Sequence, residues 1–171
     1  PDSKYLAYYV NDQSNVEKYP LVNNEVQNAE VLYEYYPMAG RASESVKLNV
    51  YSVGKNSNLE IQTDKDYEYL TNIYWHPTDP IIYVAQLNRD QNELRLNSFH
   101  VNSGQYVATL FTESDPNYIQ PLKPMFFLEN RNNEFLWLSR RENYRSAYLY
   151  TESGELLQEI KFEGDIDEIV G

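Results

Sequence analysis

The chain is built from short runs of β-branched and aromatic residues that are separated by clusters of Pro, Asn and Asp. Residues 69–75 and 81–85 are two such runs, and Pro77 and Pro80 mark the turn between them. Residues 93–99 form a third run, in which leucines alternate with charged and polar side chains. Runs of this length and composition between turn residues are typical of antiparallel strands. The pattern therefore predicts an all-β fold.

The run at residues 81–85 is apolar on both faces. Tyr83 points to one side of the predicted strand, whereas Ile82 and Val84 point to the other. An antiparallel sheet that exposes one face to water alternates apolar and polar residues instead. A strand without this alternation needs cover on both sides, which sheets stacked around an axis supply in a β-propeller. The core strand of a β-sandwich is the alternative interpretation.

An internal repeat favours the propeller. Gly54, Gly104 and Gly154 each fall in a predicted hairpin turn, at a spacing of 50 residues. A period of about 40 to 50 residues with four strands per period is typical of propeller blades. We expect an incomplete blade at residues 1–63 with a long insert at 11–40, complete blades at 64–113 and 114–163, and the start of another at 164–171.

The first unit contains one clear strand and one stretch without a pattern. Residues 4–10 are apolar on both faces and look like the counterpart of the run at 81–85. Residues 11–36 are rich in Asn, Asp, Glu and Gln and show neither strand nor helix periodicity. We expect a long loop there, of a kind that is often functional.

Composition narrows the functions that this chain could have. The net charge of −12 disfavours binding to nucleic acid or to anionic lipid. The absence of cysteine excludes a disulfide framework, a thiolate nucleophile and cysteine-ligated zinc. No apolar run approaches the roughly 20 residues of a membrane span.

The sequence also lacks the parts of a hydrolytic site. No G-x-S-x-G nucleophile elbow is present. His76 and His100 are the only histidines, and their positions predict a turn residue and a strand-end residue rather than a base or a metal ligand. We therefore expect no catalytic residue, no metal and no cofactor in this chain.

Four stretches resemble the propeller of the dipeptidyl peptidase IV family. Residues 87–92 read L-N-R-D-Q-N and resemble the family's L-N-R-x-Q-N signature, which follows a strand like residues 69–75. Residues 1–8, 36–40 and 137–144 are similar to its P-D-G-K-x-L-A-Y, Y-P-x-A-G and W-x-S-x-R-D-G-Y segments. The resemblance covers essentially the whole chain, and its structural signature residues are Trp75, Asn88, Arg89, Gln91 and Asn92.

The resemblance implies a fold and a function. The chain would be about two and a half to three blades of an eight-bladed ring. The parent protein would be a bacterial serine exopeptidase of the periplasm or cell envelope that releases Xaa-Pro or Xaa-Ala dipeptides from peptide substrates. A C-terminal α/β-hydrolase domain would carry its Ser-Asp-His triad, and the propeller would gate and position the peptides. The resemblance also allows for a homodimer, while this chain alone would be inactive.

A few residues of this chain can be given expected roles, three of them from the resemblance and the arginines from their chemistry and position. Tyr118, Ile119 and Gln120 fall where the family lines an extended part of its substrate pocket. For Arg89 we expect a bidentate bond that locks one blade to the next. Arg140 and Arg141 fall at a hairpin tip, where exposed surface charge is expected.

Two other functions stay open at this point. One is a non-catalytic propeller that serves as a scaffold for protein–protein binding. The other is a sugar-binding β-sandwich, which would spread its tyrosines along one exposed face. The full reading frame separates the first from a peptidase, because only the peptidase has a G-x-S-x-G motif downstream.

Overall fold

The computed structural model describes residues 3–121, 123 and 125–170, which form strands, turns and loops. The Pro1-Asp2 part of one family-like segment and Gly171 of the last expected unit lie outside the described residues. The strands are β1 (Tyr5–Asp12), β2 (Lys18–Asn23), β3 (Glu30–Tyr35), β4 (Ser45–Ser52), β5 (Ser57–Glu60), β6 (Tyr69–Trp75), β7 (Ile81–Leu87), β8 (Glu93–His100), β9 (Tyr106–Ser114), β10 (Phe126–Leu128), β11 (Arg131–Ser139), β12 (Ser146–Thr151) and β13 (Leu156–Ile160).

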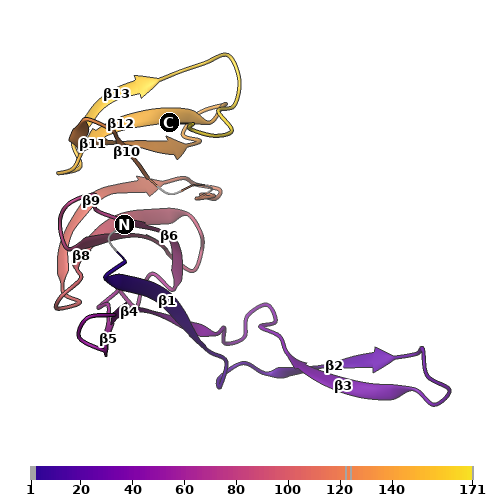
Figure 1. Ribbon diagram of the computed structural model, residues 1–171. Coiled ribbons are helices and arrows are strands. Elements are labelled where there is room, and N and C mark those ends of the chain that lie inside the picture. Colours follow the sequence, from indigo (N-terminus) through magenta and orange to yellow (C-terminus); the bar gives the residue numbers. More distant parts are fainter. Residues whose placement is uncertain (1–2, 122, 124, 171) are drawn as a thin grey trace.

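Three antiparallel sheets stack on one another, and a separate hairpin projects from the side (Figure 1). The first sheet has the order β1-β4-β5, the second β6-β7-β8-β9 and the third β10-β11-β12-β13. Gly54 lies in the turn between β4 and β5, just as Gly104 and Gly154 lie between the last two strands of the other sheets. β1 therefore corresponds to β7, as the sequence predicted.

The second sheet lies between two hydrophobic cores. Ile82 and Val84 are fully buried in a core shared with Leu48 and Val50 of β4. Tyr83 and the other side of β7 face a core that contains Phe127 and further residues of the third sheet. A strand that is apolar on both faces is thus covered on both faces. The sheets form part of a β-propeller, which confirms the predicted fold class and excludes the sandwich.

The hairpin turns at the outer edge also connect the sheets. Gly104 has a φ of +71° and Gly154 a φ of +92°, which favour glycine. A Cβ at Gly104 would collide with the carbonyl of Glu60 in the first sheet, and one at Gly154 with the carbonyl of Leu110 in the second. Gly54 has open space around it. The repeated glycine therefore marks the place where the outer hairpin of one sheet touches the sheet before it.

The insert is a hairpin, so the prediction of a long loop at residues 11–36 is wrong. β2 and β3 pair in register from Lys18 opposite Tyr35 to Asn23 opposite Glu30. They form an arm that extends away from the stacked sheets (Figure 1). The sequence pattern fails because both faces of the arm mix apolar and charged residues, so neither has the alternation of a half-buried strand.

The C-terminal segment folds back on the third sheet. Its described residues, 164–170, contain no strand. The backbone N–H of Ile166 donates to the carbonyl of Arg145 at 3.0 Å. The segment is therefore anchored to the turn between β11 and β12.

Candidate functional site

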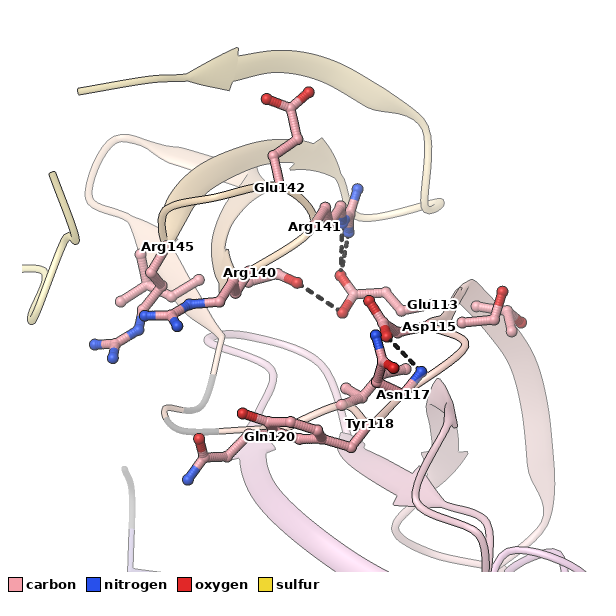
Figure 2. Close-up of a pocket in the computed structure, with 14 residues that line it drawn as sticks. Glu113, Asp115, Asn117, Tyr118, Gln120, Arg140, Arg141, Glu142 and Arg145 are labelled. Atoms are coloured by element: carbon pink, nitrogen blue, oxygen red, sulfur yellow. Dashed lines mark hydrogen bonds and ion pairs between the residues drawn. The ribbon is translucent and has the colours of Figure 1, made fainter. Parts of the chain in front are cut away.

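A cavity of about 530 Å³ opens between the second and third sheets (Figure 2). One wall is the end of β9 with the segment that follows it, and the other is the end of β11 with the turn that leads to β12. The lining residues are Thr112, Glu113, Ser114, Asp115, Asn117, Tyr118, Ile119, Gln120, Leu138, Ser139, Arg140, Arg141, Glu142 and Arg145.

All three residues predicted to bind substrate line this cavity. Tyr118 is 64% exposed, and Gln120 is also exposed. Ile119 is half-buried and packs against the core between the sheets. Figure 2 shows Tyr118 and Gln120 on one side of the cavity, across from Arg140 and Arg145. The structure brings these residues together at a concave surface, and their role in substrate binding stays a prediction.

The family signature positions the first wall of the cavity. The side-chain oxygen of Asn88 accepts the backbone N–H groups of Asn92 and Glu93, each at 3.0 Å, and this closes the turn between β7 and β8. The carbonyl of Gln91 then accepts the N–H of Ile119 at 2.7 Å. The carbonyl of Asn92 accepts the N–H of Asp115 at 3.0 Å. The signature turn therefore fixes the backbone that carries Tyr118.

Arg89 has a different role from the one expected. Its guanidinium lies 3.2 Å from the carboxylate of Glu68 and stacks over the ring of Tyr69, with 6.0 Å to the ring centre. Both partners belong to its own unit, and the described contact with Glu68 is a single exposed ion pair. The predicted bidentate lock between blades is therefore wrong. Arg89 lines a second cavity, of about 1030 Å³, between the first two sheets.

Trp75 makes a contact between sheets. Its ring stacks on Tyr5 of β1 with centres 6.1 Å apart. The hydroxyl of Tyr5 donates in turn to the side chain of Asn102, at 2.9 Å. This signature residue therefore holds the second sheet against the first.

Glu113 joins the two walls of the cavity. It comes from β9, is buried and accepts the hydroxyl of Ser139 at 2.8 Å. Nε of Arg141 donates to its other oxygen at 2.9 Å, and Nη2 of Arg141 bonds the same oxygen. Because both partners belong to the third sheet, Glu113 connects the two sheets at the rim of the cavity. The sequence carried no signal for this residue, since its partners lie 26 and 28 positions away.

Arg141 lies at the surface, as its place at a hairpin tip predicted, but its side chain is only 28% exposed and its charge is paired. Its guanidinium stacks over the ring of Tyr148 at 4.0 Å and lies within 6 Å of the rings of Phe111 and Tyr150. Nη2 also donates to the hydroxyl of Tyr150 at 2.6 Å. Burial alone would lower the pKa of Arg141, but the neighbouring Glu113 outweighs it and the pKa lies above the ordinary value. The guanidinium is a fixed cation.

Asp165 braces the second wall. One of its oxygens accepts the backbone N–H of Arg145 at 2.6 Å, and the other accepts Arg140 at 2.7 Å. The backbone N–H of Arg145 and the nearby guanidinium groups hold the pKa of Asp165 below its ordinary value. Arg140 is half-exposed, which agrees with the surface charge expected for it. The turn between β11 and β12 is thus fixed to the C-terminal segment.

The histidines have structural positions. Nδ1 of His76 accepts the backbone N–H of Asp79 at 2.8 Å and so closes the turn after β6. Its Nε2 lies 3.4 Å from Glu152 of the third sheet. His100 is exposed at the end of β8. Across the residues that the structure describes, no three His, Asp or Glu side chains are grouped so that they could hold a metal ion.

Across residues 3–121, 123 and 125–170, no helix is long and apolar enough to cross a bilayer.

Known proteins resemble this chain in sequence and in structure. The model of the dipeptidyl peptidase IV (DPP IV) N-terminal region matches residues 1–169. A crystal structure of a protein from Bacteroides ovatus assigned as a dipeptidyl aminopeptidase IV matches with a TM-score of 0.81 and 33% identity, over 88% of this chain and 22% of that one. Dipeptidyl peptidase 4 of Porphyromonas gingivalis matches in fold, with a TM-score of 0.78 and 22% identity over 94% of this chain and 23% of that one.

This chain spans less than a quarter of the length of either solved relative. The family model, in contrast, covers all but its last two residues. The chain belongs to the dipeptidyl peptidase IV family and forms part of its N-terminal propeller region.

Proposed function

We propose that this chain is a non-catalytic part of the propeller of a serine exopeptidase that removes Xaa-Pro or Xaa-Ala dipeptides from peptide N-termini. The observation that carries the proposal is the cavity between the second and third sheets. In a chain of this family, it places Tyr118, Ile119 and Gln120 on one concave wall, opposite Arg140. An aromatic ring with convergent polar groups suits a peptide side chain and its neighbouring backbone.

The remaining parts of the proposal concern the parent protein. A C-terminal α/β-hydrolase domain supplies the catalytic triad, and the propeller gates the entry of peptides and positions them. The parent protein works in the periplasm or cell envelope of a bacterium. The family assignment and the lengths of the solved relatives support a larger parent of this kind.

The test compares the chain with the protein that its full reading frame encodes. The full-length protein should hydrolyse a glycyl-prolyl chromogenic substrate, and a serine-directed inhibitor should abolish the reaction. Residues 1–171 alone should give the blank rate. Inhibitor-sensitive turnover by the isolated chain, or a reading frame without a downstream G-x-S-x-G motif, would contradict the proposal.

A scaffold for protein–protein binding is the second candidate, and the arm favours a partner protein. A two-stranded hairpin is marginally stable in water on its own. The arm nevertheless exposes apolar side chains on both faces, namely Tyr19, Leu21, Val22, Val31, Leu32, Tyr33 and Tyr35. We propose that the partner is a second copy of the chain, which pairs with the free edge of β3.

The hydrogen-bond pattern of the arm selects β3 over β2. The N–H of Tyr36 donates to the carbonyl of Glu17, so the backbone N–H and C=O groups of this pair point inward, between the two strands. In an antiparallel ladder the backbone groups of every second pair then point outward, away from the partner strand. Pro20 and Tyr33 form one of the outward pairs. Pro20 has no N–H and blunts the outer edge of β2, whereas Tyr33 keeps its donor at the edge of β3. Only the β3 edge has an unbroken row of donors.

Charge then selects the register of pairing. A two-fold axis perpendicular to the arm pairs residues of the same face. Centring it on Leu32 would set Glu30 opposite Glu34 of the other copy, which is repulsive. Centring it on Tyr33 sets Val31 opposite Tyr35 and avoids that clash. We therefore expect antiparallel pairing in which Tyr33 faces Tyr33 of the second copy.

Sedimentation of the full-length protein tests this dimer. Tyr33→Pro removes the outward donor without removing a bond between β2 and β3, so it should convert the dimer into a monomer. Tyr33→Ala keeps the donor and controls for the lost ring, and Pro20→Val controls for changes in the arm. A monomeric wild type, or a Tyr33→Pro variant that stays dimeric, would contradict the proposal.

A further inference from the structure

The two walls of the cavity between the second and third sheets are each attached to a different sheet. The wall with Tyr118 is held by the turn between β7 and β8, through the N–H groups of Asp115 and Ile119. The wall with Arg140 is held by Asp165. Nothing in these contacts sets the distance between the walls, because neither of them crosses the cavity.

The hydrogen bonds that do cross converge on one carboxylate. Among the described residues, every hydrogen bond between the two walls ends on Glu113, which accepts from Ser139 and Arg141. Glu113 is only 8% exposed. Because a buried charge without a partner is strongly destabilising, its carboxylate depends on Ser139 and Arg141. The guanidinium of Arg141 directs two donors, Nε and Nη2, at one oxygen of this carboxylate, and lysine cannot reproduce that fixed pair of donors.

Aromatic rings from both sheets hold Arg141 in place. Phe111 of β9 stacks on Tyr150 of β12 with ring centres 4.6 Å apart. Arg141 lies beside this stack, 4.0 Å from the ring of Tyr148. A change in the separation of the sheets would have to break the ion pair or the stack. The pair of Glu113 and Arg141 is thus rigidly placed on both sides.

We infer that Glu113 and Arg141 are positioning residues that set the separation of the cavity walls, and with it the size of the substrate side chain that the cavity admits. This inference rests on the proposed function, in which the cavity takes a peptide side chain, and it adds that this is the side chain of the N-terminal residue. A peptide that begins with glycine places no side chain there. The two residues should therefore matter for large N-terminal residues and not for glycine.

The experiment measures kcat and KM of the full-length protein on tyrosyl-prolyl and glycyl-prolyl chromogenic substrates. In Glu113→Gln and Arg141→Lys, we expect the KM for the tyrosyl substrate to rise about tenfold with little change in kcat, because wall position affects binding of that side chain. The glycyl substrate should stay within about twofold of wild type. Glu113→Asp keeps the charge and should recover part of the loss.

The control is an exposed ion pair on the same sheet. Arg131 and Glu134 lie 2.9 Å apart near the start of β11 and do not line the cavity. Arg131→Lys and Glu134→Gln should leave both substrates unchanged. An equal loss for both substrates in the Glu113 and Arg141 variants would overturn the inference and assign the pair a purely structural role. A wild type that cleaves neither substrate would instead refute the proposed function on which the inference rests.

Discussion

Ile82 and Tyr83 are consecutive residues of β7 whose side chains lie in two different hydrophobic cores. Ile82 packs with β4 of the first sheet, and Tyr83 packs with Phe127 of the third. This division follows from the two-residue period of a strand, which sends neighbours to opposite faces. The burial of both residues shows that the second sheet lies between two other sheets, since only a sheet with neighbours on both sides can bury both.

The first prediction concerns the core between the first two sheets. Val84 is fully buried there, and its truncation removes apolar contacts and leaves a cavity. Val84→Ala should lower the free energy of unfolding by about 2 to 3 kcal/mol. Chemical denaturation followed by tryptophan fluorescence measures the change.

Val107 provides a matched control for this substitution. It lies in the outer strand β9 and is 49% exposed. Val107→Ala should change stability by less than about 0.5 kcal/mol. Equal losses for the two variants would mean that Val84 is not covered by a second sheet.

The second prediction concerns the repeated glycine of the outer hairpins. Gly154→Ala places a Cβ against the carbonyl of Leu110 and needs a left-handed backbone conformation. We expect a loss of about 1 to 3 kcal/mol in the free energy of unfolding. Gly54→Ala meets open space without a left-handed φ and should be neutral or stabilising by up to about 1 kcal/mol. Equal changes in the free energy of unfolding for the two substitutions would show that the contact of Gly154 with the second sheet does not cause the loss.

The strands and the repeat could be predicted from the sequence because each depends on local periodicity. The apolar composition of residues 81–85 is enough to predict that both faces of this strand are buried. The spacing of the glycines is enough to predict the length of one blade. Contacts between sheets are different. Glu113 binds Arg141 because the end of β9 in the second sheet lies next to the end of β11 in the third. No local sequence pattern predicts that two such segments lie side by side. The same reasoning explains why Tyr118 could be placed only through the family resemblance.

The arm shows a second limit of sequence patterns. Strand prediction relies on one wet face and one buried face. On the arm, Leu21 pairs with Leu32 on the face that also carries Glu34. Both faces are exposed, so the rule has nothing to detect. A partner that covers the arm would restore the ordinary relation between pattern and burial.

The third prediction concerns the pH dependence of stability at the connection before β6. Burial raises the pKa of Tyr67 to about 12, and its hydrogen bond to Glu93 adds to this effect. The guanidinium of Arg95 lies 4.2 Å over the ring and partly opposes it. The pKa in the folded chain is thus above the ordinary value of 10.0. The protonated phenol therefore stabilises the fold fully below pH 10, and this contribution is lost as the pH rises towards 12.

Tyr67→Phe tests this contribution directly. The variant cannot titrate at this position, so its free energy of unfolding should fall less steeply with pH than that of the wild type. Between pH 10 and 12 the difference in slope should approach about 1.4 kcal/mol per pH unit, which corresponds to one proton released on unfolding. At neutral pH the variant should be less stable by about 1 kcal/mol, because Glu93 loses a donor. Urea denaturation midpoints at a series of pH values between neutral and 11 measure both effects, and parallel pH profiles for the two proteins would show that the phenol of Tyr67 ionises equally well in the folded and unfolded chains.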